Sequence, residues 1–310
     1  MQYTQPDHPA RGFNERTVAY EAVSEAHLAE QLVRQQGYVF REPEHFDREL
    51  ALDKELVVRF LKATQPDEWC KLEAQYAAIA ERELFKQLER ALKDRGTLDV
   101  LRQGLKLIPN IRFSFCFFQP ASGMNPELVR LYEANLLSVM PQVRYSRRNE
   151  NAIDTVLFVN GLPVATLEFK NLLTHSTFKH AERQYRTDRP PAGEPLLTFK
   201  RGALVHFALD QDNVSMTTRL QNGRTRFLPF NRGRDGGAGN PDILEEFRIA
   251  YLYRDLPDAP AVFGRETWLA IIGRFLHLER DEGKTNLIFP RYQQLDAVTS
   301  PEACQQTCRP

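Results

Sequence analysis

The sequence has no long apolar run and no net charge. None of its apolar stretches reaches the roughly 18 residues that a membrane-spanning helix needs. The polar, proline-bearing start, MQYTQPDHPARGFNER, has no apolar segment of the kind that a secretory signal carries. Basic and acidic residues number 41 each, so a surface that binds nucleic acid would have to gather its basic groups locally. We therefore expect a cytoplasmic protein with no membrane contact.

Cysteine is also scarce. The chain has four, and two of them, Cys70 and Cys116, lie in apolar stretches and are expected to be buried thiols. The other two, Cys304 and Cys308, stand near the end of the sequence. Their spacing supplies at most half of a zinc site, so the cysteines do not indicate a metal centre.

Apolar periodicity predicts helices and strands along most of the chain. The predicted helices cover residues 24–38, 47–62, 66–93, 126–140 and 176–189, and the predicted strands cover 111–118, 142–146, 203–209 and 214–220. This order of helices and sheet segments indicates an α/β or α+β fold.

A change of composition divides the chain. Residues 230–241, FNRGRDGGAGNP, are rich in glycine and arginine and have no periodicity, which is typical of a long loop or linker. Two further helices are predicted after it, over 243–256 and 266–279. We predict a first domain over 1–240 and a helical segment over 241–310.

The most informative stretch is NAIDTVLFVNGLPVATLEFKN, residues 151–171. It predicts two apolar strands around an Asn-Gly turn, yet it carries Asp154, Glu168 and Lys170. Charged groups on an apolar hairpin cost desolvation free energy unless something pairs with them. This hairpin is therefore expected to hold a partner for two carboxylates and an ammonium group.

The turn decides whether these groups meet. With a two-residue loop, Asp154 would pair with Leu167, and Glu168 would point to the opposite face of the hairpin. A three-residue loop with Gly161 in a left-handed bulge position reverses this parity. We predict the three-residue loop, because it gathers Asp154, Glu168 and Lys170 on one face.

Two carboxylates gathered in this way repel each other unless a cation lies between them. Mg²⁺ prefers carboxylate oxygens and keeps several waters, and Mn²⁺ is its usual substitute. We predict that Asp154, Glu168 and the backbone carbonyl of Phe169 hold the ion, and that Lys170 orients or helps deprotonate a metal-bound water. Such a set suits phosphodiester hydrolysis. In the alternative, Asp154 caps a turn and Glu168 and Lys170 form a solvated pair at a strand end.

Longer stretches resemble a known family. The run from SEAHL…GY through ENAIDTVLFVNGLPVATLEFKN to HAERQYRTDRPPAGEPLLTFKRGALVHFALDQDNVSMTTRLQNGRTRFLPFNRG, GAGNP and LIFPRYQQLDAV is similar to the N-terminal region of the restriction (R) subunit of Type I restriction-modification enzymes. The resemblance implies a nuclease of the PD-(D/E)xK superfamily, with a central mixed sheet flanked by helices. It also implies that Asp154, Glu168 and Lys170 are the metal-binding and water-activating set.

The resemblance adds two residues to the predicted site. It points to Glu25 on the first helix as a supporting acidic group, and to Gln184 on the helix after the hairpin. In the family a tyrosine commonly follows this glutamine by four residues, whereas here that position is Asp188 and the tyrosine is Tyr185.

Basic residues flank the hairpin on both sides. As an isolated run they would be a solvated face, but beside a nuclease site they are candidates for contacts with the phosphates of double-stranded DNA. These candidates are Arg144, Arg147, Arg148, Lys179, Arg183 and Arg186.

In the complete family, cleavage is coupled to ATP-driven translocation, and the modification and specificity subunits choose the DNA sequence. Here Gly283-Lys284-Thr285 lacks the first glycine of a Walker A loop, since Leu278 stands at that position. Gln294 matches the family's adenine-contacting glutamine, but without a phosphate loop we expect no useful ATP binding. The resemblance implies that residues 241–310 are a helical linker and the truncated start of the family's helicase-like motor domain. We therefore expect a chain that stops before the ATPase, with ATP a cofactor of the full-length family only.

Two other functions remain open. The chain is either a catalytically silent remnant that binds DNA or docks onto the complex, or a stand-alone repair-type nuclease of the same superfamily. A divalent ion held by Asp154 and Glu168 would separate an active nuclease from the remnant.

Overall fold

The centre of the molecule is a seven-stranded mixed sheet in the order β1-β6-β7-β8-β9-β10-β11. The computed structural model describes residues 25–171, 176–234, 237–243, 246–281 and 283–299. The strands are β1 (Val39–Phe40), β6 (Leu137–Arg144), β7 (Ala152–Val159), β8 (Leu162–Phe169), β9 (Val205–Leu209), β10 (Val214–Thr217) and β11 (Leu228–Pro229). β1 runs parallel to β6 and β8 runs parallel to β9, while the other neighbours are antiparallel.

Both faces of this sheet are covered, which explains why β7 and β8 are so apolar. Side chains alternate between the faces of a strand. On one face Leu157, Leu167 and Phe207 pack with the helix over residues 25–36 and with the C-terminal part of the chain. On the other face Val156 and Phe158 pack with α7 (Phe178–Thr187). The predicted mixed sheet flanked by helices is confirmed.

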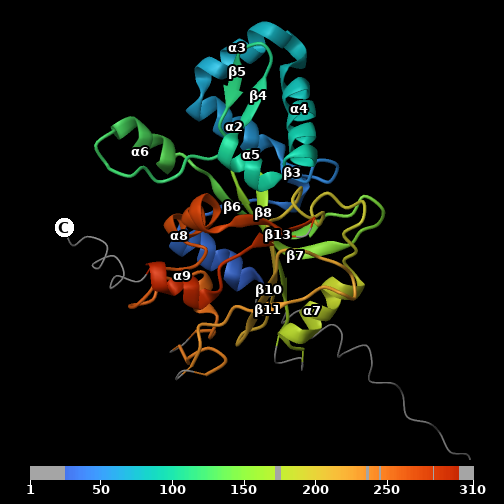
Figure 1. Cartoon of the computed structure of the whole chain (residues 1–310), viewed down its shortest axis with the longest axis vertical. Helices are drawn as coiled ribbons and strands as arrows, with labels where there is room; N and C mark the ends of the chain where they lie inside the picture. The colour runs from blue at the N-terminus through green and yellow to red at the C-terminus, as the bar shows by residue number, and fades with distance from the viewer. Residues whose placement is uncertain (1–24, 172–175, 235–236, 244–245, 282, 300–310) are drawn as a thin grey trace, which may run out of the picture.

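A helical lobe stands at one end of the sheet (Figure 1). It contains α2 (Lys54–Thr64), α3 (Pro66–Tyr76), α4 (Ala80–Asp94) and α5 (Thr97–Gln103), together with a small hairpin of β4 (Leu105–Leu107) and β5 (Ile111–Phe113). Two short strands, β2 (Phe46–Asp47) and β3 (Leu52–Asp53), lead into α2, and α6 (Pro126–Glu133) precedes β6.

The C-terminal part of the chain packs on the same core as the sheet. It comprises α8 (Arg265–Ala270), a π-helical turn (Ile271–Phe275), β12 (His277–Asp281), β13 (Lys284–Ile288) and α9 (Tyr292–Thr299). Trp268 and Phe289 belong to the cluster that covers Phe207. The hydroxyl of Tyr38 also donates to the carbonyl of Phe263 at 2.9 Å. The interior of the sheet domain is therefore completed by residues distant in sequence.

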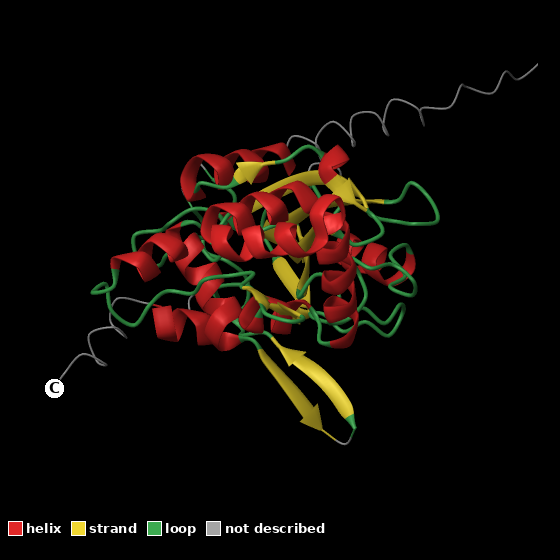
Figure 2. Cartoon of the chain, turned by 90° about the horizontal axis from the view of Figure 1, so that it is seen from above, coloured by secondary structure: helices red, strands yellow, loops and turns green. Residues whose placement is uncertain are grey.

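The antiparallel pair β12–β13 projects from the body as a two-stranded ribbon (Figure 2). Gly283 lies in its turn with a φ of 77°, and Lys284 and Thr285 begin the returning strand. A phosphate-binding loop joins a strand to a helix, so this segment has the wrong surroundings for one. The prediction that Gly283-Lys284-Thr285 is not a Walker A loop agrees with this position.

Several sequence predictions need correction. Residues 137–140, predicted as the end of a helix, begin β6 because they alternate buried side chains across the sheet. The helix predicted from residue 47 starts only at Lys54, after β2 and β3. Within 243–256 the described residues contain only a short 3₁₀ turn, Ala250–Leu252, which is buried by tertiary packing. Cys70 is exposed, not buried, whereas Cys116 is buried.

No helix among the described residues is both long enough and apolar enough to cross a membrane.

His206 on β9 gives the core a predictable pH dependence. It is 1 % exposed, and burial lowers its pKa to about 3 from the ordinary value of 6.5. Between the folded-state pKa of about 3 and pH 6.5, the unfolded chain binds a proton at this histidine and the folded chain does not. The free energy of unfolding therefore falls as the pH drops below 6.5. We expect His206 to lower the free energy of unfolding by about 2 kcal/mol between pH 6.5 and pH 5.

Urea unfolding at a series of pH values measures this loss. His206→Gln should flatten the dependence, while the same change at the exposed His277 should leave it as steep as in the wild type. An equally steep dependence in His206→Gln would show that another group is responsible.

Candidate metal centre and active site

The prediction of a three-residue loop in the β7–β8 hairpin is wrong. Asp154 and Glu168 nevertheless lie on the same face of the hairpin, because a β-bulge shifts the register. Val159 pairs with Leu162, so the turn has two residues, Asn160 and Gly161. Further along, Phe158 pairs with Pro163 and Leu157 with Ala165, which leaves Val164 as an extra residue on β8.

This β-bulge shifts the register by one residue. Thr155 consequently pairs with Leu167, and the next position along the ladder sets Asp154 opposite Glu168. The face that carries Val156 toward α7 therefore also carries the two carboxylates.

The hairpin tip is held inside the fold. Asn160 is fully buried, and its side chain bonds to three groups on two other segments of the chain. Its amide nitrogen donates to the carbonyl of Phe115 at 2.9 Å and to Asn135 Oδ1 at 2.8 Å, while its oxygen accepts from the backbone of Leu136 at 2.6 Å. The carbonyl of Gly161 accepts from the backbone of Asp53 at 3.0 Å. These bonds fix the hairpin that presents the two acids.

The two carboxylates have different surroundings. Asp154 is partly exposed, and its Oδ2 accepts a hydrogen bond from the backbone N–H of Phe169 at 2.8 Å. Glu168 is fully buried, and its Oε1 accepts from Nε of Arg189 at 2.7 Å. Burial raises the pKa of Glu168 well above its ordinary value, and the charge of Asp154 raises it further, against the opposing effect of Arg189.

The second oxygen of Glu168, Oε2, is buried without a hydrogen-bond partner among the described residues. Leaving such an oxygen unpaired costs free energy, and a cation placed between the two acids would remove both this cost and their repulsion. Asp154, Glu168 and the carbonyl of Phe169 are oxygen donors of the kind that Mg²⁺ takes. In the described part of the chain, no three His, Cys, Asp or Glu side chains gather at metal-binding distance. Within these residues, a cation would therefore rely on two carboxylates and backbone or water oxygens.

A cleft of about 900 Å³ brings most of the predicted site together. Its walls include Glu25 from the helix over residues 25–36, Asp154 from β7, Lys170 from the end of β8 and Gln184 from α7. Four segments of the chain thus meet at one opening, as the resemblance implied. Glu168, fully buried, lies behind this wall and not in it.

Sequence reasoning missed Gln142. The register of β6 against β7, with Pro141 on Thr155 and Val143 on Ile153, sets Gln142 opposite Asp154. Its backbone adopts a left-handed φ of 49°, which is strained for a residue with a side chain. Its amide nitrogen donates to Oε2 of Glu25 at 2.6 Å. A proline inside a strand indicates an irregularity, so Pro141 was the available signal.

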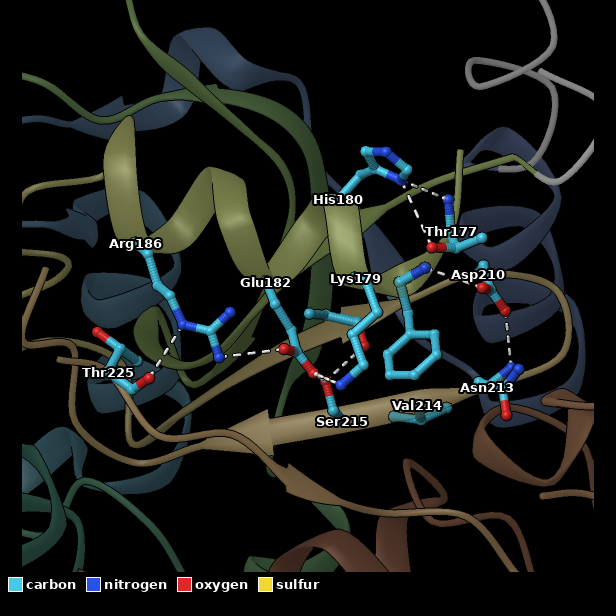
Figure 3. Close-up of polar contacts among 12 residues, drawn as sticks. Thr177, Lys179, His180, Glu182, Arg186, Asp210, Asn213, Val214, Ser215 and Thr225 are labelled. Atoms are coloured by element: carbon cyan, nitrogen blue, oxygen red, sulfur yellow. Dashed lines mark hydrogen bonds and ion pairs between the residues drawn. The ribbon is translucent and has the colours of Figure 1, made fainter. Parts of the chain in front are cut away.

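The helix that carries Gln184 is fixed by a buried acid (Figure 3). Glu182 on α7 is 3 % exposed and receives Lys179 at 2.9 Å, Arg186 at 3.1 Å and the hydroxyl of Ser215 on β10 at 2.9 Å. At the start of the helix, Asp210 accepts from the backbone N–H of Phe178 at 2.8 Å. These bonds tie α7 to the β9–β10 hairpin and set the position of Gln184 over the sheet.

The neighbouring tyrosine belongs to the core. Tyr185 is fully buried, and its hydroxyl lies 2.8 Å from Oγ1 of Thr166 on β8. Thr166 is also 2.7 Å from Nδ1 of His206. Tyr185 therefore supports the sheet beneath the acids and does not line the cleft.

Most of the basic residues predicted to contact DNA are bonded to other groups of the protein in this structure. Among the residues before the hairpin, Arg144 pairs with Glu150, Arg147 pairs with Glu49 and Arg148 donates to the carbonyl of Ala192. Lys179 and Arg186 both pair with Glu182, and Arg186 also lies over the ring of Phe227. Arg183 is exposed on α7. The first three, Lys179 and Arg183 lie at the surface, while Arg186 is half-buried.

Residues 19–225, roughly two thirds of the chain, match the family described as the Type I restriction enzyme R protein N terminus. The chain belongs to this family. The matched range contains the β7–β8 hairpin, the helix over residues 25–36 and α7, and hence every residue of the cleft. As a family of restriction endonuclease subunits, it connects the chain with DNA and with a multisubunit complex. No curated protein matches the chain.

The remaining predicted positions lie away from this centre or outside the described residues. Gln294 is on α9, where its Oε1 accepts from the backbone N–H of Arg291 at 2.9 Å. Cys304 and Cys308 lie outside the described residues.

Proposed function

We propose that the chain is a Mg²⁺-dependent DNA endonuclease domain of the PD-(D/E)xK type, which hydrolyses phosphodiester bonds of double-stranded DNA as part of a Type I restriction enzyme R subunit. One observation carries this proposal. Asp154 lies opposite a buried Glu168 that has one unpartnered oxygen among the described residues, beside the cleft wall that contains Lys170.

In this function the side chains take separate roles. Asp154, Glu168 and the carbonyl of Phe169 would hold the divalent ion, which supplies a water of lowered pKa and neutralises charge on the phosphate. Lys170 orients or deprotonates the attacking water. Glu25 and Gln184, from two different helices in the cleft wall, orient water or the phosphate group. Mn²⁺ should replace Mg²⁺, because it accepts the same oxygen donors.

DNA is proposed to be held by its backbone. Arg144, Arg147, Arg148 and Arg183 stand at the surface, and phosphate contacts there would position the duplex without reading its sequence. The exposed ion pairs of Arg144 and Arg147 are weak, so phosphates can replace the acidic partners. We propose that Lys179 also contacts a DNA phosphate, more weakly than these arginines because it pairs with Glu182. Arg186, which pairs with the same acid, is assigned to holding α7 in place. Sequence choice belongs to the modification and specificity subunits, and ATP-driven translocation belongs to the family's full-length subunit.

Nicking of supercoiled plasmid by the 310-residue chain tests the proposal. We expect nicking with Mg²⁺ or Mn²⁺, none with EDTA, and a loss of at least about 100-fold in Lys170→Ala, since general acid–base groups contribute factors of this size. Lys106→Ala, at an exposed position of β4, is the matched control and should nick at the wild-type rate.

Equal nicking by Lys170→Ala and the wild type would overturn the assignment of Lys170. Absence of nicking by every protein, with DNA binding retained, would instead favour a silent domain that binds DNA or docks onto the complex.

A further inference from the structure

Arg189 stands directly behind the acidic pair, and the proposed function gives it no part. It follows the last residue of α7 by two positions and precedes Pro190 and Pro191, whose rings restrict the backbone. It is 8 % exposed. The carbonyl of its neighbour Asp188 accepts a hydrogen bond from Asn151 beside β7 at 3.3 Å. The backbone that carries Arg189 is thus held in place, and its guanidinium lies against β8 of the sheet.

The contact between Arg189 and Glu168 uses one oxygen only. Nε donates to Oε1 at 2.7 Å, and Oε2 of the same carboxylate, equally buried, has no partner within the described structure. An arginine that pairs with a carboxylate frequently takes both oxygens in a fork. Here the second oxygen is left unsatisfied at a cost in free energy, which is the arrangement expected if that oxygen serves another ligand.

From this geometry we infer that Arg189 is a positioning residue, which holds Glu168 by Oε1 so that Oε2 is presented to the divalent ion together with Asp154. This inference rests on the proposed function. Arg189 would restrict the rotation of the Glu168 carboxylate, and its fixed positive charge would offset the second acid before the ion binds. Residues that orient metal ligands typically change metal affinity by about 10- to 100-fold when they are lost.

Binding of Mn²⁺ in the absence of DNA, followed by the EPR signal of the free ion, tests this inference without an activity assay. Arg189→Met should weaken Mn²⁺ binding by about 10- to 100-fold. Arg189→Lys, which restores the charge and one donor, should recover most of the affinity.

The structure offers a matched control for the loss of a buried ion pair. Nε of Arg41 also lies 2.7 Å from a carboxylate oxygen, that of the fully buried Asp53, at the start of α2. Arg41→Met should lower the thermal midpoint as Arg189→Met does, and should leave Mn²⁺ affinity unchanged.

Wild-type affinity in a folded Arg189→Met variant would overturn the inference and leave the proposed function standing. Absence of Mn²⁺ binding by the wild type would overturn both. If Arg189→Met does not fold, a crystal structure of the wild type with Mn²⁺ decides the matter. The ion should lie on Oε2 of Glu168 with Arg189 still on Oε1, whereas coordination through Oε1 with Arg189 displaced would contradict the inference.

Discussion

Asp154→Asn is expected to abolish both Mn²⁺ binding and DNA nicking, with a fall in nicking rate of about 1,000-fold or more. The change removes one of two anionic oxygen donors at the proposed metal site. The backbone N–H of Phe169, which now donates to Oδ2 of Asp154 at 2.8 Å, would find the amide oxygen of asparagine in the same place. The loss should therefore come from charge and not from local unfolding.

The same variant should be more stable than the wild type when no metal is present. The charge of Asp154 is one of the causes that raise the pKa of the buried Glu168, so removing it relieves a repulsion inside the fold. We expect a gain on the order of 1 kcal/mol in the free energy of unfolding. Added Mn²⁺ should reverse the order of stabilities, because ligand binding stabilises only the protein that binds it.

Thermal unfolding with and without Mn²⁺, run beside the nicking assay, checks both expectations. Asp67→Asn, at an exposed position in the first turn of α3, is the matched control and should keep wild-type nicking and the wild-type response to Mn²⁺. An Asp154→Asn protein that is destabilised without metal would show that Asp154 is mainly a structural cap, which was the alternative role for this residue.

Gly161→Ala is expected to destabilise the protein by roughly 3 kcal/mol, through left-handed strain and overpacking together. Gly161 has a φ of 83° in the hairpin turn. A Cβ there would lie 2.5 Å from the carbonyl oxygen of Asp53 and 2.7 Å from Cγ2 of Val57. The turn cannot move away, because the side chain of Asn160 beside it is bonded to Phe115, Asn135 and Leu136 on two other segments.

A second glycine separates the two causes. Gly37, at the end of the helix over residues 25–36, has a similar φ of 67°, but a Cβ added to it would have no neighbouring atom within 4 Å among the described residues. Gly37→Ala should therefore cost only the backbone strain, about 1 kcal/mol. Chemical denaturation of both variants measures the difference, and equal losses would show that crowding at the hairpin tip is relieved by small shifts.

Local sequence was sufficient where an element depends on its own residues. The apolar alternation and the Asn-Gly turn predicted β7 and β8, and the proline pair after Arg189 predicted the end of α7. The wider resemblance predicted that Glu25 and Gln184 would join the hairpin, and the cleft contains both.

Local sequence failed where packing outweighed it. Residues 137–140 continue a helical pattern in sequence but form β6, because the sheet offers them two buried faces. Residues 243–256 have apolar residues at helical spacing, yet within the described part of this range only Ala250–Leu252 form a helical turn, since those side chains are buried against the sheet domain.

The sequence by itself determined which charged groups form the proposed site: Asp154, Glu168 and Lys170, all carried by one apolar hairpin. Only the tertiary structure decided how they meet. The bulge at Val164 sets the register, and no periodicity reveals a single extra residue in a strand. Arg189 and Gln142 became part of the site through contacts between segments distant in sequence, because a hydrogen bond depends on distance in space and not on separation along the chain.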